Sequence, residues 1–246
     1  MYLGPCTNMP SQIKDQVLAF YCKLASDPHH RYRSWEHCFS HFSRRASFTD
    51  SEHRDTAALQ LAFYLASWGM YRGSSVLLWK DYRIHLPAVS ELLATNYGTL
   101  WNLHLDRASD DHATAEMIVS LSVALRATYR QQITEVDGRR SDFDASDTLI
   151  TKILLGTIGC TPACDRYFID GFRHVGFSYS RFGERFLCVV FQFYRKHQDA
   201  FQEAQVFISQ KSGVHYPIMK LVDMYFWELG SKLPRKGQAD ETPNGA

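Results

Sequence analysis

The sequence lacks the long apolar run that a membrane-spanning helix requires. Its most apolar window, FLCVVFQF at Phe186–Phe193, is far shorter than the roughly 20 residues that cross a bilayer. The first segment, MYLGPCTNMPSQIKDQ, has no basic stretch followed by an apolar one, so we expect no secretory signal. We therefore expect a cytoplasmic protein without a membrane partner.

An excess of charge of one sign is also missing. The chain of 246 residues has 27 Lys and Arg against 26 Asp and Glu, a formal net charge of +1. A generic polyanion binder carries a larger basic excess, so contact with nucleic acid would depend on a local patch. The six cysteines are scattered, which favours reduced thiols over a disulfide framework.

Recognisable catalytic motifs are absent as well. We find no Ser/His/Asp set, no glycine-rich phosphate loop and no pair of carboxylates at a catalytic spacing. The sequence therefore leaves open whether the protein is an enzyme. We expect neither a cofactor nor a metal ion.

The pattern that is present is helical. Apolar residues recur at steps of three and four in most segments, which predicts amphipathic helices: Ser11–Ala25, Ser34–Phe42, Thr56–Tyr71, Pro87–Leu105, Ala113–Ile133, Gly183–Gln210 and Pro217–Leu229. The segment Thr56–Tyr71 is apolar around so much of its circumference that we expect it to be a central helix. Strand signals are almost absent, and Asp137-Gly138 lies between polar residues rather than between strands.

These patterns predict an all-α fold, a single multi-helix globular domain of about nine helices. We place this domain at residues 1–233, with a subdivision conceivable near 138–147, where the chain is most polar. Residues 234–246, PRKGQADETPNGA, have almost no apolar side chains. This composition is typical of a disordered tail.

The most distinctive stretch is SDTLITKILLGTIGCTPACDRYFIDGF, residues 146–172. It predicts a helix, a tight turn bearing Gly156 and Gly159, and a second helix that begins at Thr161-Pro162. The spacing from Gly159 to Ala163 resembles the helix-hairpin-helix of DNA-binding proteins, with one extra residue in the turn. The resemblance implies that backbone N–H groups of the turn hold a phosphate.

The charge that follows this turn favours the same interpretation. Between Arg166 and His197 six basic residues face two acidic ones, and aromatic residues alternate with them. Such a surface suits a nucleic-acid strand, with Arg166 and Arg173 on neighbouring phosphates. The alternative is an ordinary corner of a helical bundle, with the aromatic rings in the core and the arginines in solvent.

A second stretch contains Arg31 and, six positions later, His37. The pair resembles the Arg-x(4–6)-His motif of the HEPN family of helical ribonucleases. The resemblance implies an RNA-cleaving toxin or defence ribonuclease that works as a homodimer. In that chemistry the histidine moves a proton and the arginine stabilises the phosphorane charge.

Two further spacings suit metal ligands but are incomplete. His37 and His41 are four apart on one helix face, and Cys160 and Cys164 are also four apart. A site requires a third and usually a fourth ligand: His29, His30 or Glu36 could complete the histidine pair, whereas no second pair accompanies the cysteines. We assign no metal site, and the sequence leaves open whether His37 and His41 bind a metal.

Two last segments have a packing explanation and a functional one. Gly69 and Gly73 in LASWGMYRGSS either let another helix approach closely or end a helix. Lys220 and Asp223, three apart in YPIMKLVDMYFWE, form either a solvated helix face or a buried pair with a reactive lysine. Three function classes result: a nucleic-acid-associated protein, an Arg31/His37 ribonuclease, and a non-catalytic protein-interaction domain.

Overall fold

Helices make up most of the chain in the computed structural model, which describes residues 9–48, 50–105 and 110–234. The α-helices within these ranges are α1 (Met9–Ala25), α2 (Ser34–Ser43), α3 (Ser51–Ser67), α4 (Leu86–Leu92), α5 (Asp111–Gln132), α6 (Asp147–Thr157), α7 (Arg166–His174), α8 (Glu184–Lys196), α9 (Gln198–Ser212) and α10 (Ile218–Ser231). Five short 3₁₀ helices join them: η1 (Arg31–Arg33), η2 (Arg45–Ser47), η3 (Val76–Trp79), η4 (Tyr82–His85) and η5 (Thr95–Asn102). The predicted all-α fold is confirmed.

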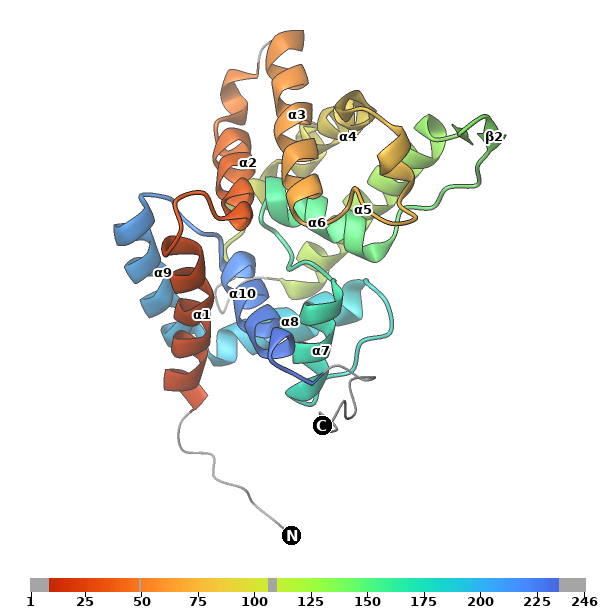
Figure 1. The fold of residues 1–246 in the computed structure, drawn as a ribbon. Coiled ribbons are helices and arrows are strands. Elements are labelled where there is room, and N and C mark those ends of the chain that lie inside the picture. The colour runs from red at the N-terminus through yellow and green to blue at the C-terminus, as the bar shows by residue number, and fades with distance from the viewer. Residues whose placement is uncertain (1–8, 49, 106–109, 235–246) are drawn as a thin grey trace, which may run out of the picture.

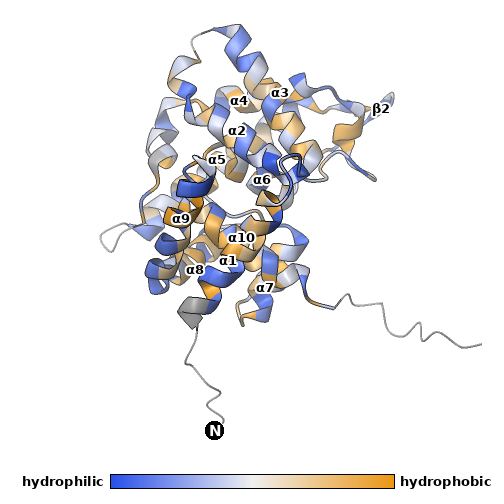
Figure 2. Cartoon of the chain, turned by 60° about the vertical axis from the view of Figure 1, so that its left-hand side comes forward, coloured by the Kyte–Doolittle hydropathy of each residue, from blue (hydrophilic) through white to orange (hydrophobic). Residues whose placement is uncertain are grey.

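The helices form two groups, which are joined by the contact of α5 with α8 (Figure 1). Helix α10 packs on α7, α1 and α9 in the lower group, and α3 packs on α2 and α4 in the upper group. Helix α6 contacts α2, α3 and α5, while α5 also contacts α8. In Figure 2 hydrophobic residues gather on α10, in the middle of the lower group.

The most buried helices are α6 and α10, rather than the predicted Thr56–Tyr71. Every residue of α6 from Leu149 onward is buried, whereas α3 leaves Leu59 50% and Phe63 56% exposed. The sequence pattern of α3 misleads because one of its two apolar stripes, which contains Leu59 and Phe63, faces outward. A central position depends on which neighbours cover a helix, and this information lies outside the helix itself.

Helix α3 also ends earlier than the Gly73 boundary that we considered. Gly69 adopts a left-handed conformation with φ +79°, just after the last turn. The Gly69 N–H donates to the Ala66 carbonyl and the Met70 N–H donates to the Leu65 carbonyl, both at 2.9 Å. This pair of bonds is a Schellman motif, which satisfies the last carbonyls of the helix and turns the chain at Trp68.

Two expectations about element boundaries are wrong. The segment Gly183–Gln210 is two helices, α8 and α9, which meet at His197. The second helix of the hairpin starts at Arg166 rather than at Thr161-Pro162, and Asp165 caps it by accepting the Phe168 N–H at 3.1 Å. Before that point the Asp223 carboxylate accepts the Ala163 N–H and the Thr151 hydroxyl oxygen accepts the Cys164 N–H. These bonds to side chains take the place of hydrogen bonds within a helix.

A short hairpin corrects the expectation about Asp137-Gly138. Strands β1 (Glu135–Val136) and β2 (Arg139–Arg140) pair antiparallel around this dipeptide. Both turn residues have positive φ, 50° for Asp137 and 71° for Gly138, which is what a two-residue hairpin turn demands. The flanking residues are polar because the hairpin projects away from the helices (Figure 1).

None of the described helices is both long and apolar enough to span a membrane. The predicted tail at 234–246 falls almost wholly outside the described residues, which end at Pro234.

Candidate functional site

The glycine-bearing turn after α6 lies in the interior of the protein. Thr161 and Ala163 are 0% and 3% exposed. A Cβ atom added to Gly156 would lie 2.3 Å from Cε1 of Tyr64, and one added to Gly159 would lie 2.4 Å from Cγ of Pro217. The glycines therefore permit close packing, and the turn is buried where a phosphate would have to reach it.

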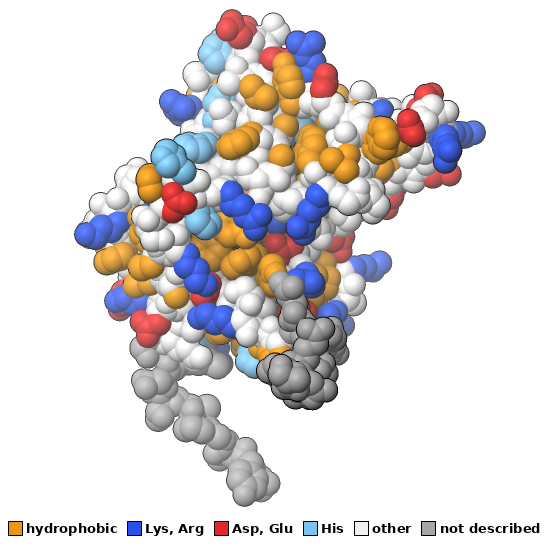
Figure 3. All heavy atoms as spheres, viewed as in Figure 1, with side chains coloured by type: hydrophobic (Ala, Val, Ile, Leu, Met, Phe, Trp, Pro, Cys, Tyr) orange, Lys and Arg blue, Asp and Glu red, His pale blue; other side chains and the backbone are white. Residues whose placement is uncertain are grey.

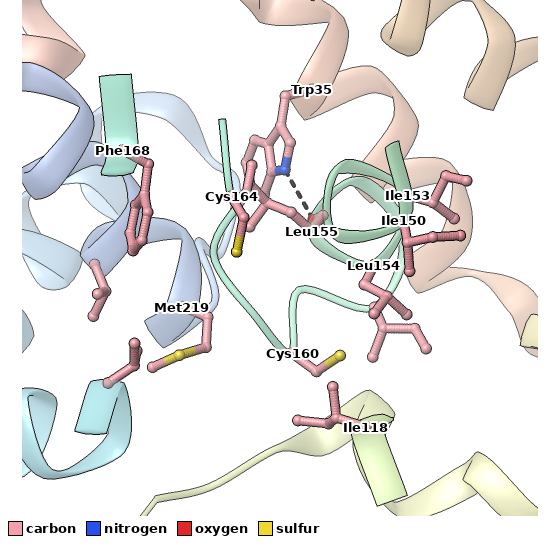
Figure 4. Packing of buried hydrophobic residues seen from close by; sticks show 14 of the residues in the cluster. Trp35, Ile118, Ile150, Ile153, Leu154, Leu155, Cys160, Cys164, Phe168 and Met219 are labelled. Atoms are coloured by element: carbon pink, nitrogen blue, oxygen red, sulfur yellow. Dashed lines mark hydrogen bonds between the residues drawn. The ribbon is translucent and has the colours of Figure 1, made fainter. Parts of the chain in front are cut away.

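The cysteines of this segment share that environment. Figure 4 shows Cys160 and Cys164 among buried hydrophobic residues, while the Trp35 indole N–H donates to the Leu155 carbonyl at 3.0 Å. Burial raises the pKa of the Cys160 thiol to about 12. Among the described residues no three His, Cys, Asp or Glu side chains are grouped so that they could hold a metal ion.

Beside this turn, aromatic rings from five elements form one contiguous set, which we call the aromatic cluster: Phe20, Tyr32, Trp68, Tyr167 and Trp227. Tyr32 stacks on Trp68 with ring centres 4.2 Å apart. Trp227 makes edge contacts with Phe20 at 5.3 Å, Tyr32 at 5.7 Å and Tyr167 at 5.0 Å. All but Phe20 are partly exposed, so part of the cluster is accessible to solvent.

Three arginines, the rim arginines, border the aromatic cluster: Arg31, Arg72 and Arg166. The Arg31 guanidinium lies 4.7 Å from the Tyr32 ring centre and donates to the Tyr32 hydroxyl at 2.8 Å. The Arg166 guanidinium lies 4.8 Å from the Tyr167 ring centre. Arg72 folds back over Gly69, next to Trp68, with its Nε 2.9 Å from where a Cβ would stand.

The rim arginines are exposed, and none of them belongs to an ion pair within the described part of the chain. Figure 3 shows Lys and Arg side chains across the middle of the face formed by α1, α7 and α10, next to a strip of hydrophobic side chains. Arginine beside exposed aromatic rings can bind an anion and stack on a planar group at the same time.

Two buried ion pairs lie beneath the rings, and we call them the lysine–aspartate cluster. Lys220 Nζ is 2.9 Å from Asp223 Oδ2, and both side chains are 2% exposed. Lys152 Nζ is 2.9 Å from Asp165 Oδ2, with exposures of 3% and 15%. Both ammonium groups lie over the Trp68 ring, at 4.9 Å for Lys152 and 4.8 Å for Lys220. The Trp68 ring therefore covers both ammonium groups.

The environment of Lys220 combines desolvation with compensating contacts. Burial lowers the pKa of Lys220 and raises the pKa of Asp223, while their mutual attraction opposes both shifts. Phe20 and Trp35 rings lie 5.2 Å from the ammonium group, and Asp223 also accepts the Ala163 N–H at 3.0 Å. A buried pair survives in a protein only with such additional partners.

The Trp68 indole nitrogen is an exception to this satisfaction of polar groups. Its Nε1 atom is buried, and no described residue accepts its hydrogen bond. Buried donors without an acceptor are rare and costly. Because the atom is buried, a ligand on the surface of the cluster does not reach it, and the unsatisfied donor adds to the cost of holding Trp68 in this position.

The structure brings together parts of all four stretches that the sequence singled out. Arg31, the Trp68–Arg72 segment, Arg166 and the Lys220–Asp223 pair all belong to this site, although they lie up to 192 positions apart. Sequence reasoning missed Tyr32, Trp227, Lys152 and Asp165, and it included Tyr167 only among the aromatic residues that alternate with the basic ones. The one available signal was Lys152, a lone charge within the apolar run LITKILLG.

Other predicted residues lie elsewhere or apart. Arg31 contacts Tyr32, whereas His37 is exposed on α2 and no described contact joins the two. The ribonuclease hypothesis stays a prediction, because its motif acts between two copies of a chain. His41 on the same helix is partly buried, and desolvation followed by the charges of Arg44 and His53 lowers its pKa.

The basic stretch Arg166–His197 divides between surface and core. Arg173 is exposed and donates to the Tyr179 carbonyl at 2.9 Å. Phe168 and Phe172 are fully buried and contribute to the core, so they cannot stack on bases. The exposed aromatic surface is found around Trp68 instead.

Comparison of the chain with protein-family models, curated proteins and solved structures found no match. The function must therefore be inferred from this geometry.

Proposed function

We propose that the protein binds single-stranded nucleic acid on the aromatic cluster and its rim arginines. The observation that carries the proposal is the set of partly exposed rings bordered by three arginines without carboxylate partners. Bases of any sequence stack on aromatic side chains, and arginines follow the phosphates. A single strand fits better than a duplex because its bases are free to stack.

The parts of the site have distinct roles in this proposal. Tyr167 and Trp227 offer ring surface for bases, while Arg31 and Arg166 hold phosphates on either side of the cluster. The lysine–aspartate cluster is neutral as a whole and supports Trp68 from below, so the attraction for phosphate comes from the rim arginines.

The near-neutral net charge of +1 sets the expected strength of the electrostatic contribution. Three phosphate contacts to a single strand give a slope of log K against log salt of about −2. This slope is modest compared with that of a strongly basic protein. Stacking on the rings, which is insensitive to salt, must then supply much of the affinity.

The test is a fluorescence anisotropy titration of a labelled 12-nucleotide oligo(dT) and oligo(U) at two salt concentrations. We expect Arg31→Gln, Arg72→Gln and Arg166→Gln each to weaken binding by about threefold to tenfold and to lower the slope by about 0.7. Arg139→Gln in the exposed β2 strand is the matched control and should bind as wild type does. Wild-type protein that binds neither oligomer refutes the proposal.

The same reaction tubes separate the other two function classes. Cleavage of oligo(U) that is lost in His37→Ala would favour the ribonuclease hypothesis. An absence of both binding and cleavage would favour a protein-interaction domain.

A further inference from the structure

A groove of about 990 Å³ lies beside the start of α8. The loop Gly176–Gly183 forms one wall, and α8 and Val119 of α5 form the other. Its polar lining consists of Ser178, Tyr179, Ser180, Arg181, Glu184 and Arg185. The two arginines are exposed, and neither belongs to an ion pair within the described ranges.

Hydrogen bonds hold the loop in place, so the groove is preformed. The Tyr179 hydroxyl and the Phe182 N–H both donate to Asp147 Oδ2 at 2.8 Å. Arg126 pairs with the other carboxylate oxygen of Asp147. The Arg173 guanidinium binds the Tyr179 carbonyl, which attaches the end of α7 to the loop.

Helix α7 connects this groove to the aromatic cluster. Arg166 is its first residue, on the cluster, and Arg173 lies seven residues later, on the loop. Seven residues rise about 10.5 Å and complete nearly two turns, so the two side chains project from almost the same helix face. Arg166, Arg173, Arg181 and Arg185 thus form a row from the cluster to the groove. The acidic neighbours along it are Asp170 and Glu184.

We infer that the bound strand continues from the aromatic cluster along α7 and into this groove. This inference rests on the proposed function and gives it a length requirement. A strand that reaches only the cluster contacts the rim arginines, whereas a longer one also contacts Arg181 and Arg185. The whole track corresponds to a site of about six to ten nucleotides, within the range known for single-strand binding surfaces.

The experiment compares oligo(dT) of 4 and 12 nucleotides on the full chain. We expect the 12-mer to bind at least about tenfold more tightly, with a salt slope steeper by about 1.4, because two more phosphates are neutralised. The double variant R181Q/R185Q should lose most of the affinity gained by the 12-mer and leave the 4-mer unchanged. R166Q should weaken both. The double variant R139Q/R140Q in the hairpin controls for net charge.

Different outcomes separate the two proposals. If R166Q weakens the 12-mer and R181Q/R185Q does not, the cluster binds nucleic acid but the groove is unused, and the inference is overturned. If a 12-base-pair duplex binds as tightly as the single strand, stacking is not used and both proposals fail. Thermal unfolding of each variant verifies that these exposed substitutions leave the fold intact.

Discussion

The Lys220 ammonium group lies 4.8 Å from the centre of the Trp68 ring. The Trp68 side chain therefore belongs both to the surroundings of a buried ion pair and to a partly exposed aromatic surface. Tyr32 stacks on the same ring. Stability and ligand binding are therefore expected to meet at Trp68, and substitutions there can separate the two.

Removal of Lys220 should be strongly destabilising. Lys220→Met leaves Asp223 buried without its counter-charge, which typically costs about 3–5 kcal/mol of unfolding free energy. The double variant K220M/D223N should recover part of that loss, because the asparagine amide is neutral and its oxygen can still accept the Ala163 N–H. Urea unfolding measures both. A double variant less stable than K220M would contradict the buried-pair interpretation.

Trp68→Phe should affect binding more than stability. The indole N–H has no acceptor among the described residues, so its loss should change the unfolding free energy by less than about 1 kcal/mol. Affinity for oligo(dT) should fall, because the phenyl ring offers the ligand less surface than the partly exposed indole. Trp68→Ala removes the ring that covers both lysines and should lower the unfolding free energy by about 2–4 kcal/mol. Equal binding by wild type and Trp68→Phe would show that the indole does not contact the ligand.

Gly156→Ala should destabilise through packing alone. Its Cβ would lie 2.3 Å from the buried Tyr64 ring, and forced overpacking costs about 1–3 kcal/mol. Gly138→Ala is a matched comparison, since φ there is +71° but nothing lies within 4 Å, so only backbone strain of about 1 kcal/mol applies. Thermal unfolding of both variants distinguishes the two costs. A Gly156→Ala protein as stable as wild type would mean that the turn is open.

His85 should make stability fall at acidic pH. It is fully buried between two tyrosines, with Nε2 2.7 Å from the Tyr71 hydroxyl and Nδ1 2.6 Å from the Tyr129 hydroxyl, and burial lowers its pKa to about 3. Because the unfolded state binds the proton more readily, the stability that neutral His85 contributes is complete above its unfolded-state pKa of about 6.5 and is lost as pH falls toward 3. The loss is about 1.4 kcal/mol per pH unit.

The comparison that isolates this effect uses His85→Gln, which cannot titrate. The difference in unfolding free energy between wild type and this variant should shrink as pH falls from 6.5 to 4. A difference that stays constant over that range would show that His85 keeps the same protonation state in the folded and unfolded chains.

The break between α8 and α9 shows why some boundaries could not be predicted from the sequence. Phe193, His197 and Phe201 recur at the spacing of an uninterrupted helix. Eight residues span about 12 Å along a helix, yet the Phe193 and Phe201 ring centres are 6.0 Å apart. The chain bends so that both rings reach the core, and tertiary packing outweighs the local pattern.

The sequence by itself determined the helices, because period, caps and glycines act over a few residues: Asp110 caps α5 and Ser146 caps α6 through their own neighbours. It also indicated Arg31, Arg166 and Lys220 as residues of interest, each within a separate stretch. Only the tertiary structure decided that they meet. Tyr32, Trp68 and Trp227 come from distant elements, and no periodic pattern encodes the contact of Tyr32 with Trp227 across 195 positions. That contact depends on how whole helices pack. The hydrophobic effect that buries their apolar faces is non-directional, so the partners of each face are fixed only when all the helices are in place.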